Sequence, residues 1–307
     1  MSGNWKIVSV VFRLKSPLHI GYMPFKGSVV SPTRYYIPGR NFWGAVTKRI
    51  TEAKYTKPSP KNYRETGKCV MENFRFSYFY IYHDKDLYMP HYEKEGLKFG
   101  EITKEEFEHK FIASIISTAI DSKTKTAKDE SLHEIEFINN EFKDEKGNTK
   151  TVKISGCIYI KNNGNTGERI AVEDKGIVIE GFNIIQELIL GGESKYGFGH
   201  VLLDSINLED SKDEEESNEL IVKLKSNKPI PAHLEYAKNL VFKGDVELLT
   251  GRGYYDPKGS KNKNGSDTKP GVVISKPEYY LSPGTIIEKD LNCEMNWDGT
   301  LKVNSSE

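Results

Sequence analysis

The sequence has few cysteines, no long apolar stretch and no signal-like start. Its three cysteines, Cys69, Cys157 and Cys293, lie far apart in a chain of 307 residues, so neither a disulfide framework nor a CxxC zinc pattern is expected. No run of about 18 apolar residues occurs, which argues against a transmembrane helix. Residues 1–6 lead directly into a strand-like run instead of a secretory leader. These absences predict a cytoplasmic protein that makes no membrane contact.

Acidic residues are absent from the chain as far as Thr51. Residues 1–68 hold 13 Lys and Arg against two acids, Glu52 and Glu65, although the whole chain has 44 basic and 44 acidic residues. Part of the compensation lies in residues 209–219, which carry seven acids against Lys212. A basic N-terminal region beside an acidic body favours a surface that faces a polyanion. A solvated basic face without any partner is the alternative interpretation.

Apolar periodicity predicts alternating strands and helices in the first two thirds of the chain. Strands are expected where β-branched and aromatic residues gather, at residues 6–14, 74–83, 152–160 and 201–208. A loop rich in proline and glycine at residues 16–38 precedes a helix over 39–50, which Asn41 would cap. A polar connection then runs to about Lys68. A second helix over residues 183–190 would stop at the glycines that follow it.

The order strand, helix, strand, insertion, helix, strand predicts an α+β fold of the ferredoxin-like kind, one antiparallel sheet with helices on one face. Inside the insertion, two strand candidates flank a polar, hairpin-like stretch, at residues 111–120 and 132–138. The acidic run is expected to be a linker between a first domain, residues 1–208, and a smaller β-rich domain, residues 220–307. The second domain has several short strand candidates, at residues 220–224, 240–249, 272–275 and 285–287, and a polar loop at 258–269.

Residues 191–199, with the sequence GGESKYGFG, contain four glycines. Glycines permit left-handed backbone angles and a close approach of the backbone to a ligand. Backbone amides in this segment could hold phosphates, while Lys195 adds charge and Tyr196 adds a stacking surface. A P-loop and a dinucleotide fingerprint are excluded, because the expected order is helix then loop and the GK[ST] element is missing. A turn that only reverses the chain is the alternative.

Four segments, taken in order, resemble motifs of the RAMP superfamily, the ferredoxin-like subunits of CRISPR–Cas effector complexes. They are SPLHIG at 16–21, YIPGRNFWGA at 36–45, TAIDSKTKTAKDESLHEIE at 118–136 and the glycine-rich segment. The third is similar to the stretch that builds a protruding β-hairpin, or thumb, in type III backbone subunits. The resemblance spans residues 5 to about 208. It implies a subunit that holds CRISPR RNA and shapes it against target RNA beside other subunits of the complex, and no cofactor is expected.

The resemblance also implies a set of RNA contacts. Guide phosphates would be contacted by polar residues around the start of the first helix and by glycines of the glycine-rich segment, namely Arg34, Arg40, Asn41, Lys48, Gly192, Gly197 and Gly199. The Ile-Pro-Gly turn would present a helix N-terminus, which is a natural phosphate site. At the tip of the hairpin, Lys123 and Lys125 would press against a guide–target duplex or a neighbouring subunit. A solvated hairpin tip is the alternative.

Catalysis is not expected. Type III backbone subunits cleave target RNA with an aspartate in the loop before the Ile-Pro-Gly turn, but residues 21–36 contain no Asp or Glu. Metal-assisted cleavage needs an oxygen ligand for the cation. The alternative is a RAMP endoribonuclease that cleaves target RNA or processes precursor RNA, with His19 as acid or base, although its apolar neighbours favour a packed histidine. No standard metal site fits the loose cluster His83, Asp84, Asp86, His91 and Glu93.

The C-terminal region carries features that resemble larger RAMP subunits. Residues 242–254 combine a strand with a Gly-Arg-Gly turn, and Pro283 and Gly284 form a second turn signal. A second, degraded ferredoxin-like half is therefore possible. Arg252 could hold a phosphate or the guide's handle, or it could form a structural salt bridge. The resemblance implies a single-copy subunit at one end of the filament, of the Csm-type or III-D kind. An RNA-binding protein of similar fold outside CRISPR systems is the alternative.

Overall fold

The centre of the molecule is an eight-stranded sheet in which every pairing is antiparallel. The computed structural model describes residues 5–21, 29–162, 170–209, 219–249, 252–253, 273–274 and 278–304. The sheet runs in the order β18–β19–β1–β14–β5–β3, with β4 on β14 and β6 on β5. Its strands are β1 (Trp5–Leu14), β3 (Tyr36–Ile37), β4 (Phe74–Phe76), β5 (Phe79–His83), β6 (Asp86–Leu87), β14 (Lys153–Lys161), β18 (Glu187–Ile189) and β19 (His200–Glu209).

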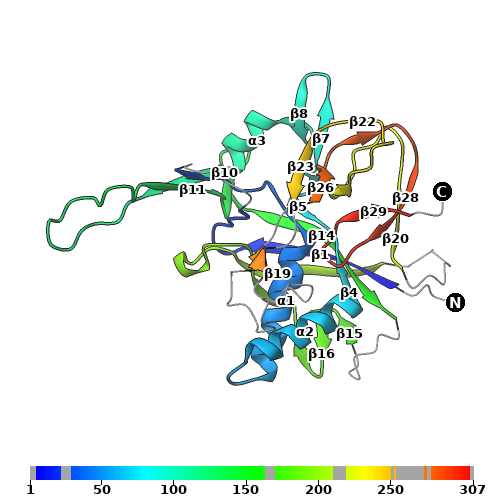
Figure 1. Ribbon diagram of the computed structural model, residues 1–307, viewed down its shortest axis with the longest axis horizontal. Coiled ribbons are helices and arrows are strands. Elements are labelled where there is room, and N and C mark those ends of the chain that lie inside the picture. The colour runs from blue at the N-terminus through cyan, green and yellow to red at the C-terminus, as the bar shows by residue number, and fades with distance from the viewer. Residues whose placement is uncertain are drawn as a thin grey trace.

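Two helices, α1 (Gly39–Lys54) and α2 (Pro60–Asn73), cover one face of this sheet (Figure 1). Along β1, every second side chain from Val8 to Leu14 is buried, as expected for a strand with one face on the core. The Phe12 ring lies 5.5 Å from that of Phe42 on α1, and Phe42 stacks on Phe79 at 3.8 Å. The predicted α+β class, with an antiparallel sheet and helices on one face, is confirmed.

Several local predictions were wrong. Residues 183–190 form no helix: Glu187 and Ile189 are exposed while Leu188 and Leu190 are buried, a strand-like alternation that pairs β18 with β19. Asn41 does not cap α1, because Pro38 holds the N-cap position and its carbonyl accepts the Asn41 amide. The expected strand over 74–83 is two strands, β4 and β5.

The supposed polar connection to Lys68 is largely helix α2. Its start was readable from the sequence as a capping box with Pro60 as the first helical residue. The Ser59 hydroxyl accepts the Asn62 amide, and the Ser59 amide donates to the Asn62 side-chain oxygen.

The insertion between β6 and β14 contains a long hairpin that projects from the body (Figure 1). Its strands are β10 (Ile112–Ser117) and β11 (His133–Ile138), and β2 (Val30–Ser31) adds to β11 in parallel. The predicted strand pair around a polar tip is thus confirmed, with shorter strands. Smaller elements surround it: β7 (Pro90–Glu93), β8 (Gly96–Phe99), β9 (Ile102–Thr103), α3 (Lys104–Phe111), β12 (Glu141–Lys143) and β13 (Thr149–Thr151). A separate three-stranded sheet follows β14, with β15 (Ile170–Glu173), β16 (Gly176–Ile179) and β17 (Phe182–Asn183).

The C-terminal region forms a six-stranded sheet of its own. Its order is β20 (Ile221–Leu224), β28 (Leu291–Met295), β29 (Leu301–Val303), β21 (Leu234–Glu235), β26 (Glu278–Leu281) and β23 (Val246–Leu249). Two short pairs accompany it, β22 (Phe242–Lys243) with β27 (Ile286–Ile287) and β24 (Arg252–Gly253) with β25 (Val273–Ile274). The described residues of this region are all strand, turn or loop.

The C-terminal sheet does not bury its apolar side chains alone. Its core includes Leu234, Leu281 and Leu301, together with three tyrosines from the N-terminal region, Tyr36, Tyr78 and Tyr80. The expected linker lies almost wholly outside the described residues, as does the expected loop at 258–269. None of the described helices is both long enough and apolar enough to cross a membrane.

Candidate nucleic-acid interface

The glycine-rich segment, residues 191–199, joins β18 to β19 and contains one short 3-10 turn, Ser194–Tyr196. Gly191 and Gly199 have left-handed φ angles of 72° and 86°. A Cβ at Gly199 would overlap the carbonyl oxygen of Leu190, and one at Gly191 would overlap that of His19. Glycine is therefore required at both positions by conformation and by space. The segment is a tightly packed turn.

Backbone amides of this segment are already used inside the protein. The Gly192 amide donates to the His19 carbonyl at 2.9 Å, and the Gly199 amide donates to the Pro17 carbonyl at 2.7 Å. The Gly197 amide donates to the Ser194 carbonyl at 3.0 Å. Each N–H carries a single proton, so these three amides cannot also form the phosphate cradle that the sequence suggested. Of the predicted contacts in this segment, the side chains of Lys195 and Tyr196 are left as candidates.

Beside Ser194, which is also exposed, the segment offers the side chains of Lys195 and Tyr196 to solvent. Both lie in the 3-10 turn, and Tyr196 is 66% exposed. An exposed aromatic ring beside an ammonium group provides a stacking surface for a base and a charge for its phosphate. The turn thus holds Lys195 and Tyr196 outward on a rigid base, and their contact with RNA stays a prediction.

His19 is sealed beneath the segment. Its side chain is 4% exposed, and its Nδ1 donates to the Glu136 carbonyl at 2.6 Å. The backbones of Gly21 and Gly192 lie so near its ring that a Cβ on either would fall 2.9 Å and 3.3 Å from ring atoms. The packed-histidine interpretation therefore holds, and His19 links the early loop, residues 16–21, to the base of the protruding hairpin.

The base of the hairpin also contacts the glycine-rich segment directly. Phe137 on β11 packs edge-on against Phe198 at 5.2 Å. The Glu136 carboxylate accepts the Thr33 amide at 2.9 Å, from the loop that precedes α1. Three segments that are far apart in the sequence, at 16–21, 118–138 and 191–199, thus meet at one place. Sequence reasoning did not single out Glu136, because its partner becomes visible only when β2 pairs with β11.

The hairpin exposes lysines and apolar side chains to solvent. In its tip, the amides of Lys123 and Thr124 donate to the Asp121 carboxylate at 2.8 Å and 3.0 Å. The Thr124 amide, followed by that of Lys123, lowers the pKa of Asp121. Lys125 adopts a left-handed φ of 59°. The turn is therefore built locally and leaves both lysines exposed. Large apolar side chains are also exposed along the hairpin, namely Ile115, Ile116, Ile120 and Leu132.

The N-terminus of α1 is covered by the C-terminal sheet. Gly39 is buried, and a Cβ there would overlap the Phe76 carbonyl and lie 2.9 Å from the carbonyl oxygen of Asp298. Arg40 extends over the Trp297 ring at 5.8 Å. The turn that joins β28 to β29 thus occupies the position where a phosphate would meet the helix N-terminus. Arg40 remains a half-buried candidate contact, but the expected helix-terminus phosphate site is filled by protein.

Arg34 is also committed to the C-terminal sheet. Its guanidinium pairs with Glu247 at 2.9 Å and donates to the Tyr36 hydroxyl at 2.8 Å. Burial lowers the pKa of Arg34, but its contacts with Tyr36 and with the Glu247 carboxylate outweigh burial and hold that pKa above its usual value. Only 12% of the side chain is exposed. We therefore leave Arg34 out of the RNA-contacting set.

The remaining predicted residues belong to other elements. Lys48 is exposed on α1, where its ammonium lies 3.9 Å from Glu52. Asn41 is half-buried in the first turn of α1. Arg252 belongs to the two-residue strand β24, and its side chain lies outside the described part of the chain. The interface therefore keeps its centre at the glycine-rich segment and the protruding hairpin.

Comparison with known proteins gives only distant similarity. No family model matches the chain, and no curated protein matches it. Two solved chains come from cryo-EM structures of the Type III-B Cmr-beta bound to cognate target RNA, one of them also with AMPPnP in state 1. They share 12% identity, with TM-scores of 0.47 and 0.48, and the match covers 91% of this chain and 86% and 85% of theirs. A chain from the apo state of Type III-B Cmr-beta has 10% identity and a TM-score of 0.35, covering 65% of this chain and 96% of that one. The functional assignment rests on the chain's own residues.

The suggested metal-ligand cluster splits into separate pairs. His83 lies 3.5 Å from Asp84 and packs edge-on against the Phe142 ring. His91 contacts Glu93 at 3.2 Å, and Lys98 pairs with the same carboxylate at 2.7 Å. Within the described ranges, no group of three or more His, Cys, Asp and Glu side chains is placed to hold a metal ion.

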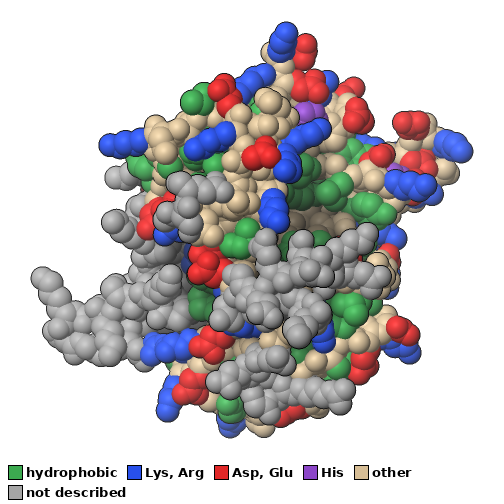
Figure 2. All heavy atoms as spheres, turned by 90° about the vertical axis from the view of Figure 1, so that its right-hand side faces the viewer, with side chains coloured by type: hydrophobic (Ala, Val, Ile, Leu, Met, Phe, Trp, Pro, Cys, Tyr) green, Lys and Arg blue, Asp and Glu red, His purple; other side chains and the backbone are tan. Residues whose placement is uncertain are grey.

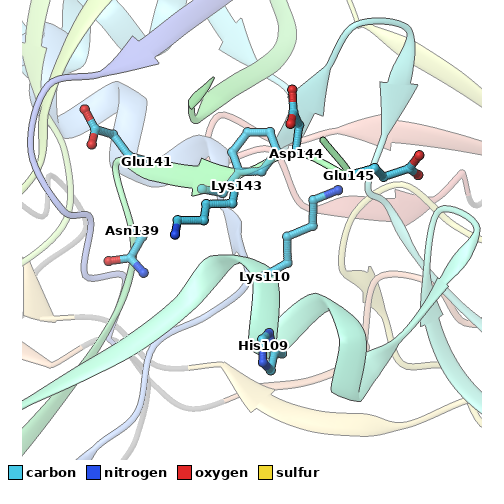
Figure 3. Close-up of a pocket in the computed structure, with 8 residues that line it drawn as sticks. His109, Lys110, Asn139, Glu141, Lys143, Asp144 and Glu145 are labelled. Carbon is cyan, nitrogen blue, oxygen red and sulfur yellow. The ribbon is translucent and has the colours of Figure 1, made fainter. Parts of the chain in front are cut away.

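A hollow between α3 and the β12–β13 hairpin is a second place to look for a site (Figure 3). Its carboxylates, Glu141, Asp144 and Glu145, point in different directions in Figure 3 and do not converge. Lys110 lies over the rings of Tyr88, Phe111 and Phe142 at 5.4, 5.3 and 5.1 Å, so its ammonium is held by cation–π contacts. The hollow has neither a uniform charge nor a converging set of ligands.

The face formed by the C-terminal sheet carries mixed charge. Figure 2 shows lysines, carboxylates and hydrophobic side chains interspersed across it. Its exposed apolar residues include Val241 and Tyr236. A polyanion is attracted by an excess of one sign, which the described residues of this face do not show. The candidate interface therefore stays on the side of the hairpin.

Proposed function

We propose that this chain is a non-cleaving, RNA-holding subunit of a type III CRISPR–Cas effector complex in antiviral defence. Its partners would be CRISPR RNA, target RNA and other subunits of the complex. The four sequence motifs support the type III assignment. Membership of the Csm-type or III-D group, and a single-copy position at one end of the filament, remain predictions of the sequence.

The observation that carries the proposal is the convergence of three motif segments on one surface. Gly192 binds the His19 carbonyl, His19 binds the Glu136 carbonyl, and Phe137 packs on Phe198. These contacts fix the orientation of the protruding hairpin relative to the turn that bears Lys195 and Tyr196. A strand of RNA needs such fixed contacts for its backbone, because phosphate contacts set position and register. The arrangement suits holding RNA in a defined path.

The proposed contacts divide between the turn and the hairpin. Tyr196 would stack on a base, and Lys195 would neutralise a neighbouring phosphate. At the hairpin tip, Lys123 and Lys125 would contact either the phosphates of a guide–target duplex or the surface of a neighbouring subunit. Arg40 and Lys48 are secondary candidates.

The proposal that the subunit does not cut RNA has two supports. The loop at residues 21–36 has no Asp or Glu, and part of it, residues 22–28, lies outside the described residues. Glu136 does bring a carboxylate to this loop, but it already accepts the Thr33 amide, and a single carboxylate is a poor cation site. His19, the candidate acid or base, is enclosed by Gly21 and Gly192.

The test is binding and cleavage with the same labelled CRISPR repeat RNA. The intact chain should bind the RNA, shown by fluorescence anisotropy, and leave it uncut on a denaturing gel with Mg²⁺ or Mn²⁺ present. The double variant Lys195→Gln/Tyr196→Ala should bind roughly tenfold to 100-fold more weakly, since loss of one stacked base contributes about 1–3 kcal/mol. The matched variant Lys238→Gln/Tyr236→Ala, in the loop after β21, should bind as the native chain does. Equal affinity of the two variants would contradict the proposal.

The alternative is a RAMP endoribonuclease, and Glu136 is the observation that favours it. Its carboxylate lies beside the loop where related subunits place their aspartate. Discrete cleavage products from the purified chain, lost in Glu136→Gln, would replace the binding proposal with this one.

A further inference from the structure

A second basic surface lies on the two helices, apart from the glycine-rich segment. Residues 48–68 contain seven Lys and Arg against two acids in a chain whose charges balance overall. The structure places this excess at the end of α1, in the connection to α2 and along α2. We name as the basic corner the exposed or half-buried cations of residues 54–68, which are Lys54, Lys57, Lys61, Arg64 and Lys68.

The basic corner is displayed by a rigid scaffold. The Trp43 indole N–H on α1 donates to the Gly67 carbonyl on α2 at 3.0 Å. A Cβ at Gly67 would lie 3.1 Å from the Trp43 ring, so glycine allows the two helices to approach closely. The capping box between Ser59 and Asn62 fixes the start of α2. The lysines therefore project from a surface whose shape is set before any partner arrives.

The two acids of this region neutralise little of its charge. Glu65 lies 3.7 Å from Lys61, with the side chains 56% and 80% exposed. Glu52 lies 3.9 Å from Lys48, and it also accepts the Tyr63 hydroxyl at 3.2 Å. Exposed i,i+4 pairs of this kind are weak and are screened by salt. Residues 48–68 therefore keep an excess of positive charge.

Aromatic rings are interleaved with the cations. Tyr55 is 39% exposed between Lys54 and Lys57, and half-buried Tyr63 lies between Lys61 and Arg64 in sequence. Cations that alternate with exposed aromatic rings suit single-stranded RNA, whose phosphates and bases need both kinds of contact. Binding of an acidic protein would require the positive charges of the basic corner but not its aromatic rings. The pattern therefore favours RNA.

Helix α1, at whose end the basic corner begins, also contacts β17. On α1, the Arg49 Nε donates to the Asn183 carbonyl at 3.2 Å, and its guanidinium lies over the Phe182 ring at 5.0 Å. In Figure 1 the two helices lie below the protruding hairpin. We propose that the basic corner is a second RNA-binding surface, which takes the phosphates of a single-stranded segment. This inference rests on the proposed function only in naming RNA as the polyanion.

The experiment compares full-length variants for binding to one labelled single-stranded RNA of mixed sequence, over a series of KCl concentrations. The corner variant is Lys57→Gln/Lys61→Gln/Lys68→Gln. The control Lys85→Gln/Lys94→Gln/Lys238→Gln removes the same charge from exposed positions elsewhere. If all three lysines contact phosphates, the slope of log affinity against log salt should fall by about 2, and affinity near 0.1 M salt by roughly 100-fold. The control should keep the native slope.

Comparison with Lys195→Gln/Tyr196→Ala separates this inference from the proposed function. If the corner variant keeps native affinity and slope while the turn variant loses them, the basic corner is not an RNA surface and the proposed function stands. If the corner variant alone weakens, the inference stands and the proposed interface at the turn fails. If the native chain does not bind RNA, both are overturned. A corner variant that binds RNA normally but no longer joins the other subunits would identify an acidic protein partner instead, and would also overturn the inference.

Discussion

The Arg34 guanidinium and the Glu247 carboxylate form an ion pair of 2.9 Å across 213 residues of sequence. Glu247 also contacts the Nε2 of His233, a side chain with no solvent exposure, and His233 Nδ1 lies 2.6 Å from the Tyr78 hydroxyl. The Tyr36 hydroxyl donates to the same carboxylate at 3.3 Å. The segment that leads into α1 is therefore fastened to the C-terminal sheet by a buried polar network, and the two regions depend on each other.

Breaking this pair should destabilise the whole chain. In Arg34→Met, Glu247 would keep its charge without its cation, and we expect a loss of about 3 kcal/mol in the free energy of unfolding. Urea unfolding of the full chain measures it. The control is Lys302→Met, whose partner Glu235 is 3.9 Å away with both side chains about half exposed. That variant should lose less than about 1 kcal/mol. Equal losses in the two variants would show that the Arg34 pair does not join the regions.

The stability that Glu247 contributes should depend on pH. Burial alone would raise the pKa of Glu247, but the contact with His233 and the charge of Arg34 hold that pKa well below its usual value of 4.5. Such a carboxyl contributes stability that is complete above 4.5 and is lost as the pH falls toward the folded-state pKa. The difference in unfolding free energy between the native chain and Glu247→Gln should therefore shrink below pH 4.5. Urea titrations across that range would show it, and a constant difference would mean that the charge of Glu247 is not what stabilises the fold.

The glycine-rich segment should tolerate a methyl group at one glycine and not at another. Gly199→Ala places a Cβ against the Leu190 carbonyl at a left-handed φ, and we expect a loss of about 2–5 kcal/mol from strain and overlap together. Gly197→Ala has a similar φ of 83° but open space around it, so about 1–2 kcal/mol should be lost. Thermal or urea unfolding distinguishes them. A larger loss at Gly197 would mean that packing on Leu190 is unimportant.

The main sheet could be predicted from the sequence because several of its strands are rich in β-branched and aromatic residues. The run of Val, Ile and Phe in β1 and the aromatic run around β5 have few other ways to bury their side chains. The region around β18 was harder, since Ile184, Ile185, Leu188 and Ile189 satisfy a helical spacing as well as a strand. Only the pairing of Leu188 with Val201 on β19 decides between the two.

The sequence pointed to the exposed residues of the candidate interface but not to the buried contacts around it. Lys195 and Tyr196 lie in a turn that the four glycines of residues 191–199 already indicate in the sequence. Arg34 looked equivalent to other cations of the N-terminal region, because the carboxylate that buries it comes from β23, more than 200 residues later. For the same reason, the sequence does not reveal that Asp298 covers the N-terminus of α1. Long-range pairing of polar groups leaves no local pattern.

Cleavage of target RNA provides the last test of the proposed function. In an effector complex reconstituted with Glu136→Gln, every target cut should remain, because the proposal assigns this subunit a holding role. The Glu136 carboxylate accepts the Thr33 amide at 2.9 Å, and a glutamine side-chain oxygen can accept the same hydrogen bond, so the loop should keep its position. Size-exclusion chromatography would verify assembly, and gel analysis of labelled target would count the cuts. Disappearance of one discrete cut from an intact complex would make this subunit a nuclease, with Glu136 as the residue to pursue.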